Sequence, residues 1–109
     1  MMAEFELHKN DAGQFHFSLK SEGHTLLSSE QYTTKASALN GIESVRKNAV
    51  ENKRYIMATA KSGKPYFNLT ASNGQIIGTS VMHADEAACR MAQTKTAALA
   101  PSAGIIEES

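Results

Sequence analysis

The chain has 109 residues, with 11 basic and 11 acidic side chains and a formal net charge of zero at pH 7. Hydrophobic residues make up 41% and charged residues 20%, an ordinary globular composition that excludes a disordered, highly charged protein. The charge balance disfavours nucleic acid as a partner, because proteins that bind phosphate backbones normally carry a basic excess. One shared core is feasible at this length and two independent cores are marginal, so we expect a single domain over residues 1–109.

The compartment is inferred from the absence of targeting signals. The N-terminal residues show no basic segment followed by an apolar stretch, and no apolar run approaches the roughly 20 residues of a membrane span. We therefore expect a soluble cytoplasmic protein without membrane contact. The single cysteine, Cys89, excludes an internal disulfide, and one thiol alone does not make a zinc site.

The first half of the chain opens with the alternation of a half-buried strand pair. Its apolar members are all odd-numbered: Phe5, Leu7, Phe15, Phe17 and Leu19. Residues 10–13 between the two segments have the composition of a short hairpin turn. Facing residues of an antiparallel pair share a sheet face, so this parity predicts one buried face. A second turn at 21–23 and a short third strand at about 25–28 follow.

After the third strand the apolar period becomes that of a helix. Four residues spaced by four, three and four form one helical stripe: Ala38, Ile42, Val45 and Ala49. Thr33 or Thr34 is suited to cap the N-terminus, and Arg46 near the other end suits the negative pole of the helix dipole.

The second half of the chain repeats this order. Residues 55–69 align with 5–19 at an offset of 50, and 76–78 align with 26–28 at the same offset. The turn residues Gly23 and Gly74 are 51 apart, which leaves the offset through the following helix open between 50 and 51. Asp85 is suited to cap the second helix, and Pro101 ends it.

These patterns predict an α+β protein made of two tandem β-β-β-α units, at about 4–53 and 54–100. Neither unit can bury its apolar faces alone, so we expect one largely antiparallel sheet with both helices on one face. The result would be a monomer with an internal pseudo-two-fold axis. Residues 101–109 are interpreted as a C-terminal tail, and whether residues 103–107 form a final strand is left open.

Two segments resemble the YegP-like family. The first covers residues 29–48 and contains Tyr32, Lys35, Gly41-Ile42 and Ser44-Val45; the second covers 63–69 and 73–78. The resemblance extends over about 4–98, although Ala92–Lys95 departs from the family's Gly-Ile-x-Ser pattern. It implies small bacterial proteins with one or two copies of a three-strand, one-helix, one-strand motif, whose terminal strands are exchanged between units. It implies almost nothing about activity, because the family is biochemically uncharacterised.

Candidate binding residues lie on the even-numbered face of the first strand pair. One register places His8 opposite His16 with Cβ atoms about 5 Å apart, close enough to share a metal, with Glu6 nearby. The second copy has Ala58 and Tyr66 at these positions, so the pair is not part of the repeat. We therefore expect a solvated polar face with no metal and no cofactor.

No catalytic residues are expected. Cys89 lies among alanines of the second helix, where a small core residue is the favoured interpretation over a nucleophile. Residues 61–64 resemble a phosphate loop but correspond to a hairpin turn and precede no helix. Glu107 and Glu108 are assigned to a mobile tail.

We therefore expect a non-enzymatic module that binds a protein or a small molecule. The candidate surface comprises His8, His16, Tyr66 and Tyr32. Tyr32 is suited either to anchor the first helix, which we favour, or to line a groove. The alternative function is a weak nucleic-acid-binding sheet platform, on which bases would stack on exposed rings. An enzyme ranks third.

Overall fold

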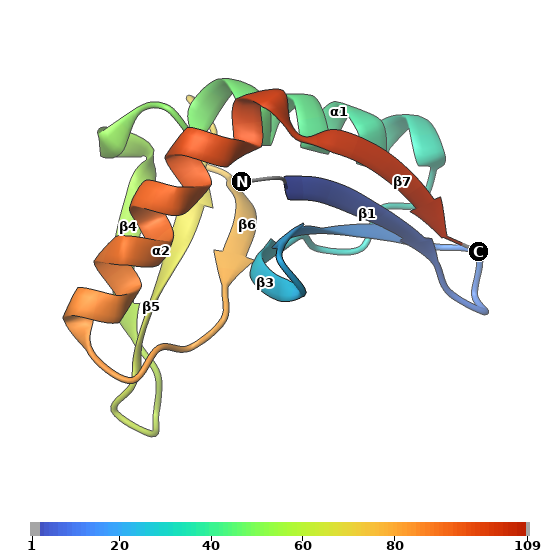
Figure 1. Cartoon of the computed structure of the whole chain (residues 1–109). Coiled ribbons are helices and arrows are strands. Elements are labelled where there is room, and N and C mark those ends of the chain that lie inside the picture. Colours follow the sequence, from blue (N-terminus) through green and yellow to red (C-terminus); the bar gives the residue numbers. More distant parts are fainter. Residues whose placement is uncertain (1–2, 109) are drawn as a thin grey trace.

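Each half of the chain folds into three strands and one helix, and a seventh strand follows the second helix (Figure 1). The computed structural model describes residues 3–108. The strands are β1 (Ala3–Lys9), β2 (Phe15–Ser21), β3 (His24–Ser28), β4 (Tyr55–Thr59), β5 (Pro65–Thr70), β6 (Ile76–Ser80) and β7 (Gly104–Glu108). The helices are α1 (Lys35–Asn48) and α2 (Glu86–Leu99), each followed by a short 3-10 turn, η1 (Asn52–Arg54) and η2 (Ala100–Ser102).

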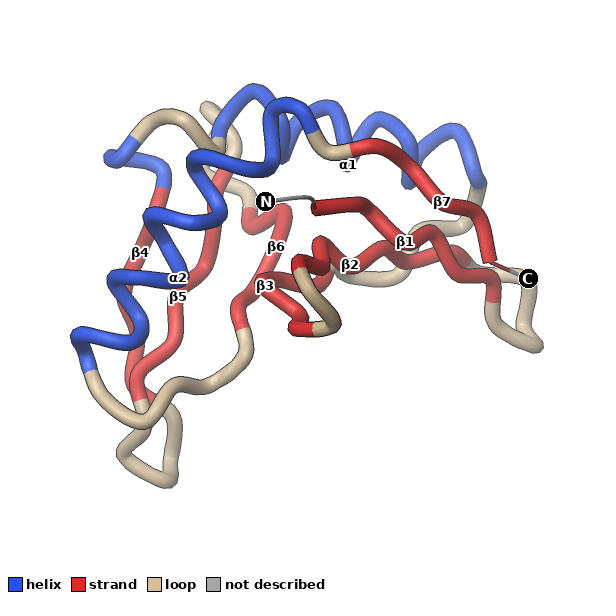
Figure 2. Tube along the Cα trace, in the orientation of Figure 1, coloured by secondary structure: helices blue, strands red, loops and turns tan. Residues whose placement is uncertain are grey.

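All seven strands belong to one mixed sheet in the order β4-β5-β6-β3-β2-β1-β7 (Figure 2). Helix α1 packs against β2 of its own half and against β5 and β6 of the other, while α2 contacts β5 and β3. The odd-numbered residues Phe5, Phe17 and Leu19 are fully buried in one core with residues of both halves. The predicted α+β class, the shared sheet and the tandem units are therefore confirmed.

The pseudo-two-fold axis passes through the pairing of β3 with β6. Ser28 and Thr79 face each other there. Ser28 also pairs with Ser18 of β2, and Thr79 pairs with Asn68, the equivalent residue of β5. Ser28 and Thr79 are thus equivalent residues of the two units. The two halves of the sheet meet through equivalent positions, as the subunits of a two-fold dimer do.

The offset between the two units changes from 50 to 51 at the second hairpin. In the first unit, Glu22 and Gly23 form a two-residue turn with φ of 52° and 80°. In the second unit the loop is one residue longer, between Ala71 and Gln75. The predicted alignment of 26–28 with 76–78 is therefore wrong by one residue. The helix caps Thr34 and Asp85, which accept from Ser37 N and Ala88 N, are also 51 apart, so this offset holds through the helices.

Residues 104–108 form a strand, which corrects the prediction of a C-terminal tail. Strand β7 pairs in parallel with β1 at the other end of the chain, with Ile105 beside Phe5 and Glu108 beside His8 (Figure 1). Ala103 is 2% exposed, and Arg46 of α1 donates to its carbonyl oxygen at 2.5 Å. The last strand of the second unit thus completes the first unit, as the family resemblance implied.

Candidate functional site

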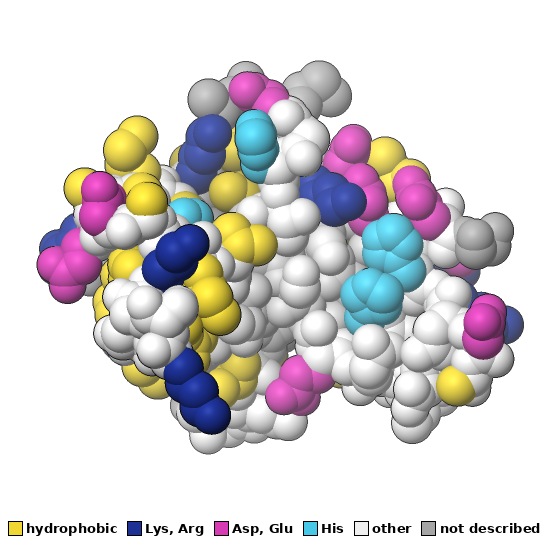
Figure 3. Space-filling model, turned by 90° about the horizontal axis from the view of Figure 1, so that it is seen from below, with side chains coloured by type: hydrophobic (Ala, Val, Ile, Leu, Met, Phe, Trp, Pro, Cys, Tyr) yellow, Lys and Arg dark blue, Asp and Glu magenta, His cyan; other side chains and the backbone are white. Residues whose placement is uncertain are grey.

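The two histidines of the first strand pair lie side by side on the sheet face away from the helices. His8 and His16 are direct cross-strand neighbours, and their rings stack with centroids 5.0 Å apart and an interplanar angle of 18°. This confirms the register considered from the sequence. Figure 3 shows histidine side chains on the underside of the molecule, with side chains of both charges beside them.

Carboxylates surround His8 on two sides. Glu6 Oε1 lies 3.4 Å from His8 Nε2 and 3.1 Å from Lys20 Nζ. The parallel pairing of β1 with β7 places Glu108 beside His8, on the side opposite His16. Glu6, His8 and Glu108 offer ligand atoms that all lie within 4.8 Å of one another. Glu108 is not among the candidate ligands predicted from the sequence, because this residue is assigned there to a tail. The apolar pair Ile105-Ile106 before it is the sequence signal that indicates a strand.

His16 is biased toward its neutral form. Burial lowers its pKa below the ordinary value, and the positive charge that His8 can carry lowers it further. The Nδ1 atom of His16 is buried without a hydrogen-bond partner among the described residues. The row across β2, β1 and β7 therefore holds His16, biased toward its neutral form, beside His8 and the carboxyl group of Glu108.

The other two candidate residues do not join this pair. Tyr66 of β5 faces Ala58 of β4, in the other half of the sheet. Tyr32 exchanges backbone hydrogen bonds with Phe15, at 2.6 and 2.7 Å, and its ring stacks on Phe17 with centroids 6.1 Å apart. Tyr32 therefore anchors α1 on the core side and contributes nothing to the open face, which corrects its place in the candidate surface.

The anchoring of α1 depends on a glycine under the Tyr32 ring. A Cβ atom at Gly41 would lie 2.5 Å from the Tyr32 hydroxyl and 2.9 Å from the Phe17 ring. Burial raises the pKa of Tyr32, and the neighbouring Glu30 raises it further. This tyrosine is therefore a packing residue that stays neutral.

The edge of the sheet at β4 differs from its counterpart in the first unit. Leu7 of β1, which β7 flanks, is 1% exposed, whereas the equivalent Met57 of β4 is 42% exposed. In the described part of the chain, β4 pairs with β5 alone. Two adjacent hollows, about 410 and 350 Å³, follow β4 along α2 and share Met57; their linings include Tyr55, Arg90 and Glu86.

The remaining sequence candidates serve packing and turns. Cys89 is fully buried, and burial raises the pKa of its thiol, the opposite of what a nucleophile needs. Residues 61–64 close the hairpin between β4 and β5, with Gly63 at a φ of 88°. None of the described helices is long and apolar enough to cross a membrane.

The architecture defines a class of protein: two β-β-β-α units in one sheet, completed by a strand exchanged from one end of the chain to the other. The family model described as "Domain of unknown function (DUF1508)" matches the chain twice, at residues 10–55 and 60–107. The chain therefore belongs to the DUF1508 family.

Similar proteins agree with this membership. The UPF0339 protein YegP of Shigella flexneri is 54% identical over 85 residues, which cover 77% of each chain. The solution NMR structure of yegP from Escherichia coli, a protein of unknown function, has a TM-score of 0.92 at 43% identity, over 99% of this chain and 94% of that one. The solution NMR structure of UPF0339 protein SO3888 from Shewanella oneidensis has a TM-score of 0.91 at 42% identity, over 98% and 92%.

Proposed function

We propose that this protein is a non-catalytic interaction module that binds an extended segment of a partner protein along the edge of β4. The observation that supports the proposal is the contrast between buried Leu7 and exposed Met57, equivalent residues of the two units. An edge strand with unpaired backbone groups is a template for strand addition, which many peptide-binding domains use.

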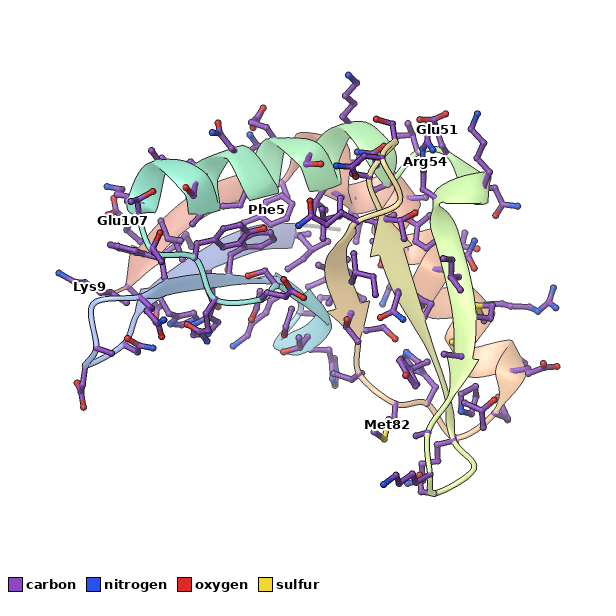
Figure 4. All side chains as sticks on the ribbon, turned by 180° about the vertical axis from the view of Figure 1, so that it is seen from behind. Phe5, Lys9, Glu51, Arg54, Met82 and Glu107 are labelled. Carbon is purple, nitrogen blue, oxygen red and sulfur yellow. The ribbon has the colours of Figure 1, made fainter. Side chains whose placement is uncertain are left out.

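Strand β7 is the internal template for such a partner. It lies beside β1, Ala103 just before it is buried, and the parallel register places Glu107 next to Leu7. Glu107 Oε1 is 2.5 Å from Lys35 Nζ at the start of α1. Figure 4 shows Glu107 near this end of α1, and Phe5 between β1 and the helix. The strand is thus held by backbone pairing, a small buried residue and one ion pair.

The second unit has the equivalent sheet edge at β4, and no strand of the described residues pairs with the free side of that edge. After α1 the chain passes through η1 directly into β4, near Glu51 and Arg54 in Figure 4, so the segment after the first helix is itself the first strand of the next unit. The hollows between β4 and α2 lie where β7 lies in the first unit. A partner segment would run parallel to β4, as β7 runs parallel to β1.

The negative charge of Glu86 at the start of α2 favours a bound segment with a basic residue at the facing position. Glu86 holds the position that Lys35 holds in α1, and its side chain is exposed. A basic residue in the bound segment would therefore take the place of Glu107. The β7 strand of a second copy would bring its own Glu107 against Glu86, so like charge disfavours a second copy as the occupant.

Labelled peptides with the sequence of residues 102–108 test the proposal, one native and one with Glu107 replaced by lysine. We expect the lysine peptide to bind the full chain about two- to fivefold more tightly than the native peptide, the range of an exposed ion pair. Glu86→Lys should reverse this preference, and Met57→Glu should weaken both peptides. Met91→Glu, at a residue 73% exposed and outside the two hollows, is the matched control.

Fluorescence anisotropy measures the binding of the labelled peptides, and three outcomes would contradict the proposal. The first is that neither peptide binds. The second is that Met91→Glu weakens binding as much as Met57→Glu, and the third is that Glu86→Lys leaves the preference between the peptides unchanged. A dimer of the chain that Met57→Glu dissociates in analytical ultracentrifugation would make a second copy the occupant and overturn the assignment to a partner protein.

A further inference from the structure

The geometry points to a zinc-binding site formed by Glu6, His8 and Glu108, which would fasten the exchanged strand β7 to β1. Their ligand atoms lie within 4.8 Å of one another, so rotation of the side chains can bring all three to the roughly 2.0–2.2 Å from one ion that zinc requires. This inference revises the metal-free expectation from the sequence. It is independent of the proposed partner site, which lies at the other edge of the sheet.

The fold supplies the three ligands from both ends of the chain. Glu6 and His8 are two residues apart on β1 and therefore point to the same face. The parallel register places Glu108 directly beside His8. One imidazole nitrogen with two carboxylate oxygens is a ligand set that zinc accepts, with water completing a tetrahedron.

The surroundings of the three ligands favour a cation. His16 stacks on His8, with ring centroids 5.0 Å apart, and restricts the orientation of its ring. The opposing charge is Lys20, whose Nζ is 3.1 Å from Glu6 Oε1. The Lys20 side chain is 34% exposed, so it can turn into solvent when an ion takes its place on the carboxylate.

The site occurs once in the described part of the chain, because the repeat does not reproduce it. The positions of Glu6 and His8 are occupied in β4 by Ile56 and Ala58, and β4 lacks the flanking parallel strand. An ion bound here would bridge the first and last strands of the chain. Its expected effect is therefore to oppose the separation of β7 from β1, in addition to any effect on global stability.

Calorimetric titration of the full chain with zinc chloride, after removal of metal with a chelator, tests the site. We expect one zinc per chain with micromolar affinity. His8→Ser and Glu108→Gln should each weaken binding at least tenfold. Glu107→Gln, which changes the neighbouring carboxylate on the helix side of the same strand, should bind zinc like the wild type. Zinc should also slow hydrogen exchange of the β7 amides in the wild type but not in Glu108→Gln.

Other results of this titration would overturn the inference. One is a failure of zinc to bind at micromolar concentration. Another is zinc binding to His8→Ser with wild-type affinity, which would place the ion at other residues. Full affinity in Glu108→Gln would show that β7 contributes no ligand and would refute the fastening of the two strands.

Discussion

Leu27 of β3 covers Gly78 of β6, and the two residues hold the same position in the two units. A Cβ atom on Gly78 would lie 2.8 Å from Leu27 Cδ1. They lie one residue from the pair Ser28 and Thr79 through which the pseudo-two-fold axis passes. Two large side chains at this position would meet across the axis. The space between the units therefore accommodates one leucine side chain, and the equivalent residue of the other unit is a glycine.

Replacement of Gly78 with alanine should therefore destabilise the chain by about 1–3 kcal/mol, the cost of overpacking a core. The matched control is Gly104→Ala, because a Cβ there meets nothing within 4 Å, and its free energy of unfolding should stay within about 0.5 kcal/mol. Urea unfolding at neutral pH measures both.

A double-mutant cycle isolates the contact between these two residues. Leu27→Ala alone should cost about 2–5 kcal/mol because it leaves a cavity. In that background Gly78→Ala should cost almost nothing, since the clashing methyl group is gone. Strictly additive effects would show that the strain at Gly78 has another source.

The shared core predicts one cooperative unfolding transition. Ile42 and Val45 of α1 are fully buried, and the helix packs on strands of both units. Ile42→Ala and Val45→Ala should each lower the free energy of unfolding by about 1–4 kcal/mol and move the whole transition. Exposed Lys47→Ala is the control. A calorimetric scan in which half the structure melts earlier would refute the shared core.

The stability of the chain should fall with acid through His16. Its pKa is below the ordinary value of 6.5 in the folded state, so the unfolded chain binds the proton more readily. The stabilisation is present above pH 6.5 and is lost as the pH falls through the lower pKa of the folded state. At neutral pH, replacing both His8 and His16 with serine should change stability by no more than about 0.5 kcal/mol per site.

NMR titration of the His16 ring and unfolding at pH 7.5 and pH 5 check this dependence. The double variant should lose less stability than the wild type between the two conditions. A His16 pKa above the ordinary value would contradict the prediction. Failure of the double variant to fold would show that the two rings are required for packing, which contradicts their assignment to a solvated face.

Tyr55 connects the start of the second unit to the end of the first helix. Its partly buried side chain donates from the hydroxyl to the Ala49 carbonyl at 2.7 Å, and burial strongly raises its pKa. Tyr55→Phe should cost about 1–2 kcal/mol, because the carbonyl loses its donor. Because the folded state holds the phenolic proton more tightly, this stabilisation is present below pH 10 and is lost as the pH rises above it. Tyr66→Phe is the control, and an equal loss there would contradict a specific role for Tyr55.

The sequence by itself determined the local elements and their buried faces. Strand alternation at Phe5 to Leu19, turn residues such as Gly13, and a cap at Thr34 each act within a few residues, so periodicity and turn chemistry predict them. The position of His8 and His16 on the open face follows from the same parity.

Only the tertiary structure decided how distant segments pair. The one-residue shift between units comes from the length of the loop before Gln75; the 51-residue spacing of Gly23 and Gly74 indicated it, but only the pairing of β3 with β6 decided that it continues through that strand. Glu108 reaches His8 through parallel pairing of the two ends of the chain, a contact that no local pattern encodes. Met57 is exposed and Leu7 is buried for the same reason: exposure of an edge strand depends on whether another segment pairs with it, and this is a property of the whole sheet.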